Sequence, residues 1–170
     1  MKTDALNPVT HPFVLSRTFN TSRERLWKAW TERDHLMQWF GPKGFTMPLA
    51  KMDFRPSGSF LYCLTSPDGK EMWGKFSYRE IVAPEKMVFI NSFSNKEGGI
   101  TRHPFSATWP LETLSKISFT EKAGQSTVTV EWVPLNASEE ERETFDGAHD
   151  GMRAGWSGTF EQLAAYLAKL

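Results

Sequence analysis

The chain has 170 residues, and its twenty basic and twenty acidic side chains cancel to a formal net charge of zero at pH 7. It therefore lacks the basic excess of a nucleic-acid-binding protein, and we expect no nucleic-acid partner. Phe, Trp and Tyr make up 14% of the residues, which suits either a well-packed core or a pocket for an apolar ligand.

The N-terminus differs in character from the rest of the chain. Residues 1–12 are polar, contain two prolines and lack the apolar segment of a signal peptide. We expect a flexible tail over residues 1–12 and a single domain over residues 13–170. No apolar run approaches the roughly 18 residues of a membrane span, and the single cysteine, Cys63, cannot form an internal disulfide. These features predict a cytoplasmic protein with no membrane span, in which Cys63 is an unreactive core thiol.

The first third of the chain predicts a strand followed by two short helices. Residues 13–19 alternate between apolar and polar side chains, which is typical of a strand. Residues 21–24 have the spacing of a capping box and open a helix that ends near Thr31. A second cap at residues 31–34 opens another helix, which Gly41 and the following proline end.

The middle of the chain predicts strands only. Apolar stretches separated by turn signals predict six of them, over residues 45–55, 59–65, 72–82, 87–93, 114–120 and 127–133. Pro48 indicates that the first of these lies at a sheet edge. Residues 100–110 fit no period. Because the strands follow one another with short turns, we expect an antiparallel meander.

The C-terminal segment predicts a long amphipathic helix. Ser138 and Glu141 form a capping box. Apolar residues then recur at steps of three and four, on one face of a helix: Met152, Trp156, Phe160, Leu163, Leu167 and Leu170. A lone helix cannot bury such a face, so we expect the sheet to curve around it. The chain therefore predicts an α+β fold, with about seven antiparallel strands wrapped around a long C-terminal helix.

Three glycines, Gly151, Gly155 and Gly158, lie beside the apolar face of that helix. Each costs about 1 kcal/mol relative to alanine in a helix interior, so their presence needs a reason. The simpler interpretation is that another element packs closely against the glycine edge. The alternative is that the glycines leave room for a bound molecule.

A curved sheet around one helix encloses a space that aromatic side chains can either fill or line. Our candidates for lining a cavity are Trp39, Phe60, Tyr62, Trp73, Phe76, Tyr78, Phe89, Phe93, Trp132, Met152, Trp156 and Phe160. The polar candidates are Arg102 and His103, in the irregular segment, and Glu131, on a strand. Each has a simpler interpretation: an exposed loop for the first two, and a solvent-facing strand position for Glu131.

Other chemistry finds little support in the sequence. The four histidines lack metal-ligand spacing, and no glycine-rich phosphate loop is present. Ser157 lies between glycines, but it falls within the predicted helix and not after a strand, as a nucleophile elbow requires. We therefore expect no metal, no cofactor and no catalytic motif.

Several blocks of the sequence resemble one known family. Residues 25–31 (RLWKAWT) and 36–42 (LMQWFGP) resemble the opening of the activator of heat-shock-protein-90 ATPase homologue family. Residues 53–58 (DFRPSG) and 79–89 (REIVAPEKMVF) resemble later blocks, and residues 149–167 resemble its closing helix. The resemblance covers about residues 13–168. It departs at the serine of the DFRPSG block, where a glycine is commoner.

This family belongs to the START-like, or SRPBCC, superfamily, so the resemblance implies a helix-grip fold. That fold is a seven-stranded antiparallel sheet around a long C-terminal helix, with two short helices after the first strand. Members commonly bind lipids, sterols, polyketides or other apolar molecules between sheet and helix, and some are cyclases, aromatases or hydrolases. The family is named after a eukaryotic co-chaperone that has a further N-terminal domain, so co-chaperone activity is not carried over.

Three functions follow as hypotheses. The leading one is a domain that binds a small hydrophobic or aromatic molecule in a cavity between the sheet and the C-terminal helix. The second is an enzyme of the cyclase, aromatase or hydrolase type that uses Glu131, His103 or Arg102 in the same cavity. The third is a protein-interaction module that regulates a chaperone. A homodimer is compatible with each of them.

Overall fold

The computed structural model describes residues 11–170, so the predicted tail over residues 1–12 lies outside the described residues except for its last two positions. The chain begins with β1 (Phe13–Phe19), α2 (Arg23–Thr31) and α3 (Arg33–Trp39). The strands that follow are β2 (Thr46–Met52), β3 (Ser59–Thr65), β4 (Glu71–Val82), β5 (Lys86–Ser94), β6 (Ile100–Thr101), β7 (Glu112–Lys122) and β8 (Gln125–Leu135). Two helices, α4 (Glu139–Gly147) and α5 (His149–Leu167), close the chain. The division into a tail and a single domain stays a prediction.

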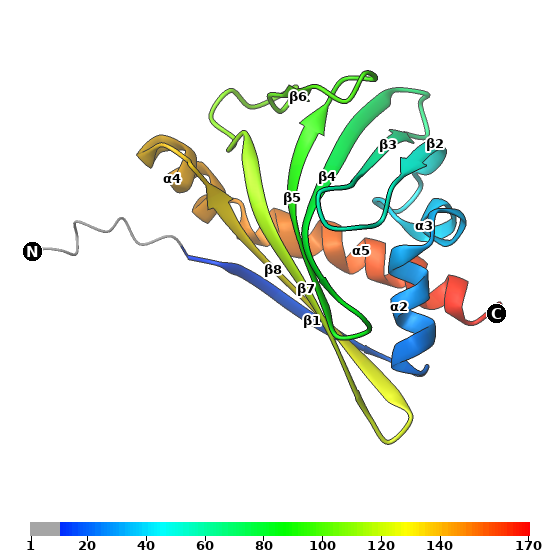
Figure 1. The fold of residues 1–170 in the computed structure, drawn as a ribbon. Coiled ribbons are helices and arrows are strands. Elements are labelled where there is room, and N and C mark those ends of the chain that lie inside the picture. The colour runs from blue at the N-terminus through cyan, green and yellow to red at the C-terminus, as the bar shows by residue number, and fades with distance from the viewer. Residues whose placement is uncertain (1–10) are drawn as a thin grey trace, which may run out of the picture.

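All the strands join one antiparallel sheet, in the order β1-β8-β7-β5-β4-β3-β2, with the two-residue β6 paired to β5. Figure 1 shows this sheet curving around α5, with α2 and α3 near the C-terminal end of α5 and α4 near its start. Strand β2 forms one edge, and its register shifts between Thr46 and Leu49, beside Pro48. The predicted α+β helix-grip fold is confirmed, and so is the edge position that Pro48 indicated.

The helix boundaries differ from the prediction at both short helices. Ser22, and not the preceding threonine, is the N-cap of α2, where its side chain accepts a hydrogen bond from Arg25 N at 3.2 Å. Helix α3 begins after Glu32, which makes no side-chain cap hydrogen bond. Neighbouring Ser, Thr and Asp residues all suit an N-cap, so spacing alone places a cap only to within a residue or two.

The C-terminal segment forms two helices where the sequence predicted one. The capping box of Ser138 and Glu141 is present and opens α4, as predicted. The chain then leaves helical geometry at Ala148, with φ −101° and ψ 5°, and α5 starts immediately after it. This break orients α4 so that its buried Phe145 packs against Trp109, with ring centroids 5.7 Å apart.

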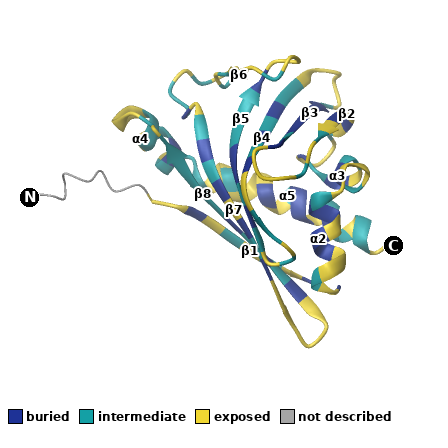
Figure 2. Ribbon diagram, in the orientation of Figure 1, coloured by how far each residue is buried: buried dark blue, intermediate teal, exposed yellow. Residues whose placement is uncertain are grey.

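The core lies between the concave face of the sheet and α5. Alternate residues of β7 and β8 are buried, which is the pattern of strands with one covered face. On α5, Trp156, Phe160 and Leu163 are buried, whereas Leu170 lies beyond the helix end and is 53% exposed. Figure 2 shows the buried residues gathered where the sheet faces α5. Within residues 11–170, no helix combines the length and apolarity needed to cross a bilayer.

Candidate ligand-binding pocket

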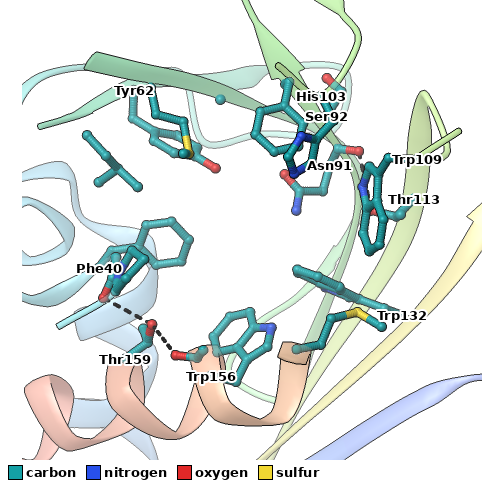
Figure 3. Close-up of a pocket in the computed structure, with 18 of the residues that line it drawn as sticks. Phe40, Tyr62, Asn91, Ser92, His103, Trp109, Thr113, Trp132, Trp156 and Thr159 are labelled. Atoms are coloured by element: carbon teal, nitrogen blue, oxygen red, sulfur yellow. Dashed lines mark hydrogen bonds between the residues drawn. The ribbon is translucent and has the colours of Figure 1, made fainter. Parts of the chain in front are cut away.

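A pocket of about 410 Å³ lies between α5 and the concave face of the sheet. Figure 3 shows α5 along its base, with side chains of the sheet and of the segment before β7 around it. Across the pocket from the segment before β7, the wall is formed by the turn after α3, at Phe40, Gly41 and Pro42. The pocket therefore occupies the space that the curved sheet and its helix enclose, and it is lined mainly by apolar side chains.

Two glycines leave the base of the pocket open. Gly151, Gly155 and Thr159 face it from successive turns of α5. A Cβ atom added at Gly151 or Gly155 would meet no other atom within 4 Å, so no element packs against either residue. At Gly158 a Cβ would come within 3.7 Å of Lys43, and Gly158 does not line the pocket. The first two glycines thus leave room, whereas only Gly158 has a close neighbour.

Aromatic rings make the walls rigid. Phe40 packs edge-on against Tyr62, at 5.4 Å between ring centroids, and against Trp156 at 6.2 Å. Trp156 in turn packs edge-on against Trp132 at 5.6 Å. Edge-to-face contacts of this kind fix the ring orientations beyond what burial alone does. Burial also raises the pKa of the Tyr62 phenol, so this residue stays protonated and neutral.

Polar groups gather at one side of the pocket. Figure 3 shows Asn91, His103 and Thr113 close together, across the cavity from Phe40. The Thr113 hydroxyl donates to the backbone oxygen of Asn91 at 3.3 Å. The backbone N–H of Phe105 donates to Nδ1 of His103 at 2.9 Å, so neutral His103 carries its proton on Nε2. Burial lowers the pKa of His103, which favours this neutral form.

The segment that carries His103 is tied to α4. Arg102 forms an ion pair with Glu141 and donates to the backbone oxygen of Trp109 at 3.3 Å. The hydrogen bond from the Ser138 backbone, together with that from Arg102, lowers the pKa of Glu141, so its carboxylate stays charged. These contacts fix the otherwise irregular segment, and with it the wall of the pocket that His103 forms.

The structure brings part of the predicted lining together. Candidates that line the pocket are Tyr62, Trp73, Phe93, Trp132, Met152, Trp156 and the polar candidate His103. The other aromatic candidates are buried in the core and do not line it: Trp39, Phe60, Phe76, Tyr78, Phe89 and Phe160. All of them lie inside the protein, but at depths where other side chains cover them.

Two polar candidates lie away from the pocket. Arg102 is held by Glu141, and it is not among the lining residues. Glu131 lies opposite Lys116 and the exposed Val14 in the sheet register, on the outer face. This corrects the enzyme hypothesis for Arg102 and Glu131, whereas His103 does line the pocket. The position of Glu131 agrees with its simpler interpretation.

Several lining residues were not among the candidates, and Asn91 is the most informative. It follows Met87 and Phe89 at steps of two along β5, so it shares their inward face. A polar residue in an alternating apolar series is a signal that the sequence does contain. Thr113 carries the same kind of signal on β7, since it lies at even steps from the buried Ile117 and Phe119. Phe40 had no comparable signal, because it lies in the turn after α3 and not on a strand.

The described part of the chain contains no candidate metal-binding site. Across residues 11–170, no three His, Cys, Asp or Glu side chains gather closely enough to hold a metal ion. Cys63 is buried, and burial raises the pKa of its thiol, as expected for an inert core cysteine. Of the residues lining the pocket, only Tyr62 and His103 are titratable within the described range.

Comparison with known proteins identifies one family. The model of the family described as "Activator of Hsp90 ATPase homolog 1-like protein" matches residues 20–168. No curated protein matches the chain.

Several solved structures have the same fold. A protein from Rhodobacter sphaeroides is 17% identical, with a TM-score of 0.75 over 95% of each chain. A protein from Nitrosomonas europaea is 18% identical, with a TM-score of 0.73 over 93% of this chain and 94% of that one. The AHSA1 protein from Silicibacter pomeroyi is 19% identical, with a TM-score of 0.71 over 93% and 98%. At such identities the likeness concerns the fold alone.

Proposed function

This chain belongs to the family of activator of Hsp90 ATPase homolog 1-like proteins, and we propose that it binds a small hydrophobic or aromatic molecule between its sheet and α5. Family and fold support a ligand-binding or regulatory domain. The observation that carries the finer proposal is the open space above Gly151 and Gly155 at the base of the pocket.

The energetics favour this interpretation over an accidental void. Gly155, in the interior of α5, costs about 1 kcal/mol relative to alanine. The chain keeps glycine at this position although an alanine Cβ would meet no neighbouring atom there. A volume of about 410 Å³ falls within the usual range for small-molecule sites.

Native mass spectrometry of the freshly purified chain tests the proposal. We expect an added mass of a few hundred daltons that disappears when the protein is denatured. The Gly155→Leu variant places a side chain in the pocket, so it should lose that mass while remaining folded. Gly147→Leu is the matched control, because Gly147 is equally unhindered but lies on α4, away from the pocket.

Tryptophan fluorescence offers an independent readout, since Trp73, Trp132 and Trp156 line the pocket. An uncharged hydrophobic fluorescent probe such as N-phenyl-1-naphthylamine should accept energy from them in the wild type and in the Gly147 variant, but much less in the Gly155 variant. Equal signals from all three proteins, together with a clean apo mass, would contradict the proposal.

The other hypotheses gain no comparable support. For an enzyme of the cyclase, aromatase or hydrolase type, Arg102 and Glu131 lie away from the pocket and only His103 lines it, and His103 alone defines no reaction. A chaperone partner, a homodimer and a cytoplasmic location stay predictions from the sequence.

A further inference from the structure

We infer, on the basis of the proposed function, that the pocket selects an uncharged aromatic molecule whose hydroxyl or carbonyl group lies against Asn91 and His103. Two independent features carry this inference: the lack of a charge in the pocket walls and the presence of polar groups without partners at one side.

The walls offer nothing to pair with a charged ligand. Within residues 11–170, no Asp, Glu, Lys or Arg side chain lines the pocket. The nearest basic residue in sequence to His103, Arg102, is already paired with Glu141 and with a backbone oxygen. A carboxylate placed in this apolar space would lose its hydration without gaining an ion pair, which disfavours its binding strongly.

The polar side of the pocket has free hydrogen-bonding capacity. Figure 3 shows the Asn91 amide directed into the cavity. Among the described residues, no hydrogen bond engages that amide, since the contact from Thr113 goes to the Asn91 backbone. His103 Nδ1 is occupied by the Phe105 N–H, which leaves Nε2–H as a second donor without a partner in residues 11–170.

These groups define the chemistry of the ligand. The Asn91 amide can both donate and accept, and neutral His103 donates from Nε2. A hydroxyl or carbonyl oxygen satisfies them, whereas a purely apolar ligand would cover them and leave them unpaired, at a cost in affinity. The surrounding rings of Phe40, Trp132 and Trp156 favour a flat aromatic body through edge and face contacts.

Three ligands of nearly the same size separate the possibilities: 2-naphthol, 2-methylnaphthalene and 2-naphthoate, the last ionised at pH 8. Isothermal titration calorimetry of the full chain at pH 8 should rank 2-naphthol as the tightest. We expect 2-naphthoate to bind at least about tenfold more weakly, since it must bury an unpaired charge. We expect 2-methylnaphthalene to bind about three- to tenfold more weakly, since it leaves the amide unpaired.

The Asn91→Leu variant tests whether the Asn91 amide makes the hydrogen bond to the ligand hydroxyl. It keeps the approximate size of the side chain and removes no internal hydrogen bond of that side chain, so its melting temperature should match the wild type. Its affinity for 2-naphthol should fall about tenfold, while its affinity for 2-methylnaphthalene should stay the same or rise. The preference for the hydroxyl should therefore disappear in this variant.

The outcomes distinguish this inference from the proposed function. Equal or tighter binding of 2-naphthoate by the wild type overturns the inference and leaves a functioning pocket. An unchanged preference for 2-naphthol in the Asn91 variant also overturns it. If none of the three binds and native mass spectrometry shows no bound molecule, the proposed function fails and the inference fails with it.

Discussion

The sheet and α5 enclose two regions that differ in how they are filled. The packed end lies under α2 and α3 and contains Trp30, Phe119 and Phe160, with Trp30 and Phe119 at 6.0 Å between ring centroids. The open end lies around Gly151 and Gly155 and contains the pocket. The same helix thus presents Phe160 and Leu163 to the packed end and Gly151 and Gly155 to the open end, so the side chains that face each end decide which becomes a core and which a site.

Trp156 separates the two ends. It stacks on Trp30 of the packed end, at 5.9 Å and an interplanar angle of 17°, and packs edge-on against Trp132 of the open end. Its ring is part of the core on one side and part of the pocket wall on the other. A ligand in the open end therefore contacts a ring that the packed end already holds in place, so changes in the open end should affect binding more than the stability of the fold.

The largest expected effect comes from truncating the packed end. Phe160 is 1% exposed and packs edge-on against Phe19 at 5.8 Å, so Phe160→Ala should lower the free energy of unfolding by about 3–5 kcal/mol. Met152 lies two turns earlier on the same helix and borders the pocket, so Met152→Ala should cost only about 1 kcal/mol. Urea denaturation measures both. Similar losses from the two variants would contradict the contrast between the ends.

An intermediate effect is expected at Gly74, where the sheet meets the pocket. A Cβ atom there would lie 2.4 Å from the Tyr62 hydroxyl oxygen, so the Tyr62 ring can occupy its position only because residue 74 has no side chain. Gly74→Ala should displace Tyr62 and lower the free energy of unfolding by about 1–3 kcal/mol. Urea denaturation measures the loss, and Tyr62→Leu in the same chain should recover part of it. A neutral Gly74→Ala would show that Tyr62 moves without cost.

A smaller effect, with the opposite sign, is expected at the open end. Gly155→Ala should raise the free energy of unfolding by about 1 kcal/mol, because alanine favours the helix and its Cβ meets no other atom. Thermal denaturation in the absence of ligand measures the gain. Gly158→Ala is the comparison, since its Cβ would touch Lys43. A loss of stability from Gly155→Ala would mean that something fills the space above it.

The sequence predicted the fold well because the signals for it are local. Alternation and turn residues placed β1 and β3 at the bounds that the structure shows, Phe13–Phe19 and Ser59–Thr65. The break at Ala148 was missed because the apolar spacing from Phe145 to Met152 is also that of one continuous helix. The family's commoner glycine at position 57 also has a local explanation, since Ser57 has a φ of 71°, where glycine is less strained.

The site was predicted only in part because a residue lines the pocket according to its position along the strand, and not only according to the face of the sheet to which its side chain points. Phe89 and Phe93 point to the same face of β5, yet only Phe93 borders the pocket, while Phe89 stacks on Phe76 at 4.0 Å. Alternation identifies the face, but the position along the strand relative to α5 depends on the curvature of the whole sheet. The glycine spacing on α5 indicated the place of the pocket better than strand alternation did, although the sequence alone could not distinguish a closely packed neighbour from open space.

The smallest expected effect is a pH dependence at the open end. Burial lowers the pKa of His103 below the ordinary value of 6.5, so the unfolded chain binds this proton more readily than the folded one. The neutral side chain therefore contributes stability that is present above about pH 6.5 and is lost as the pH falls below it. Its neighbours Phe93, Phe105 and Trp109 carry no charge that would offset this loss.

Comparing the wild type with His103→Gln isolates that contribution. Between pH 7.5 and 5 the wild type should lose more stability in urea denaturation than the variant, which cannot gain this proton. Phe160→Ala, at the packed end, should show the same pH dependence as the wild type, only offset by a constant loss. If the His103 variant follows the wild type in parallel across this range, then the open end is wet enough to hydrate the imidazolium, and the wall that Asn91 and His103 form is less apolar than the structure indicates.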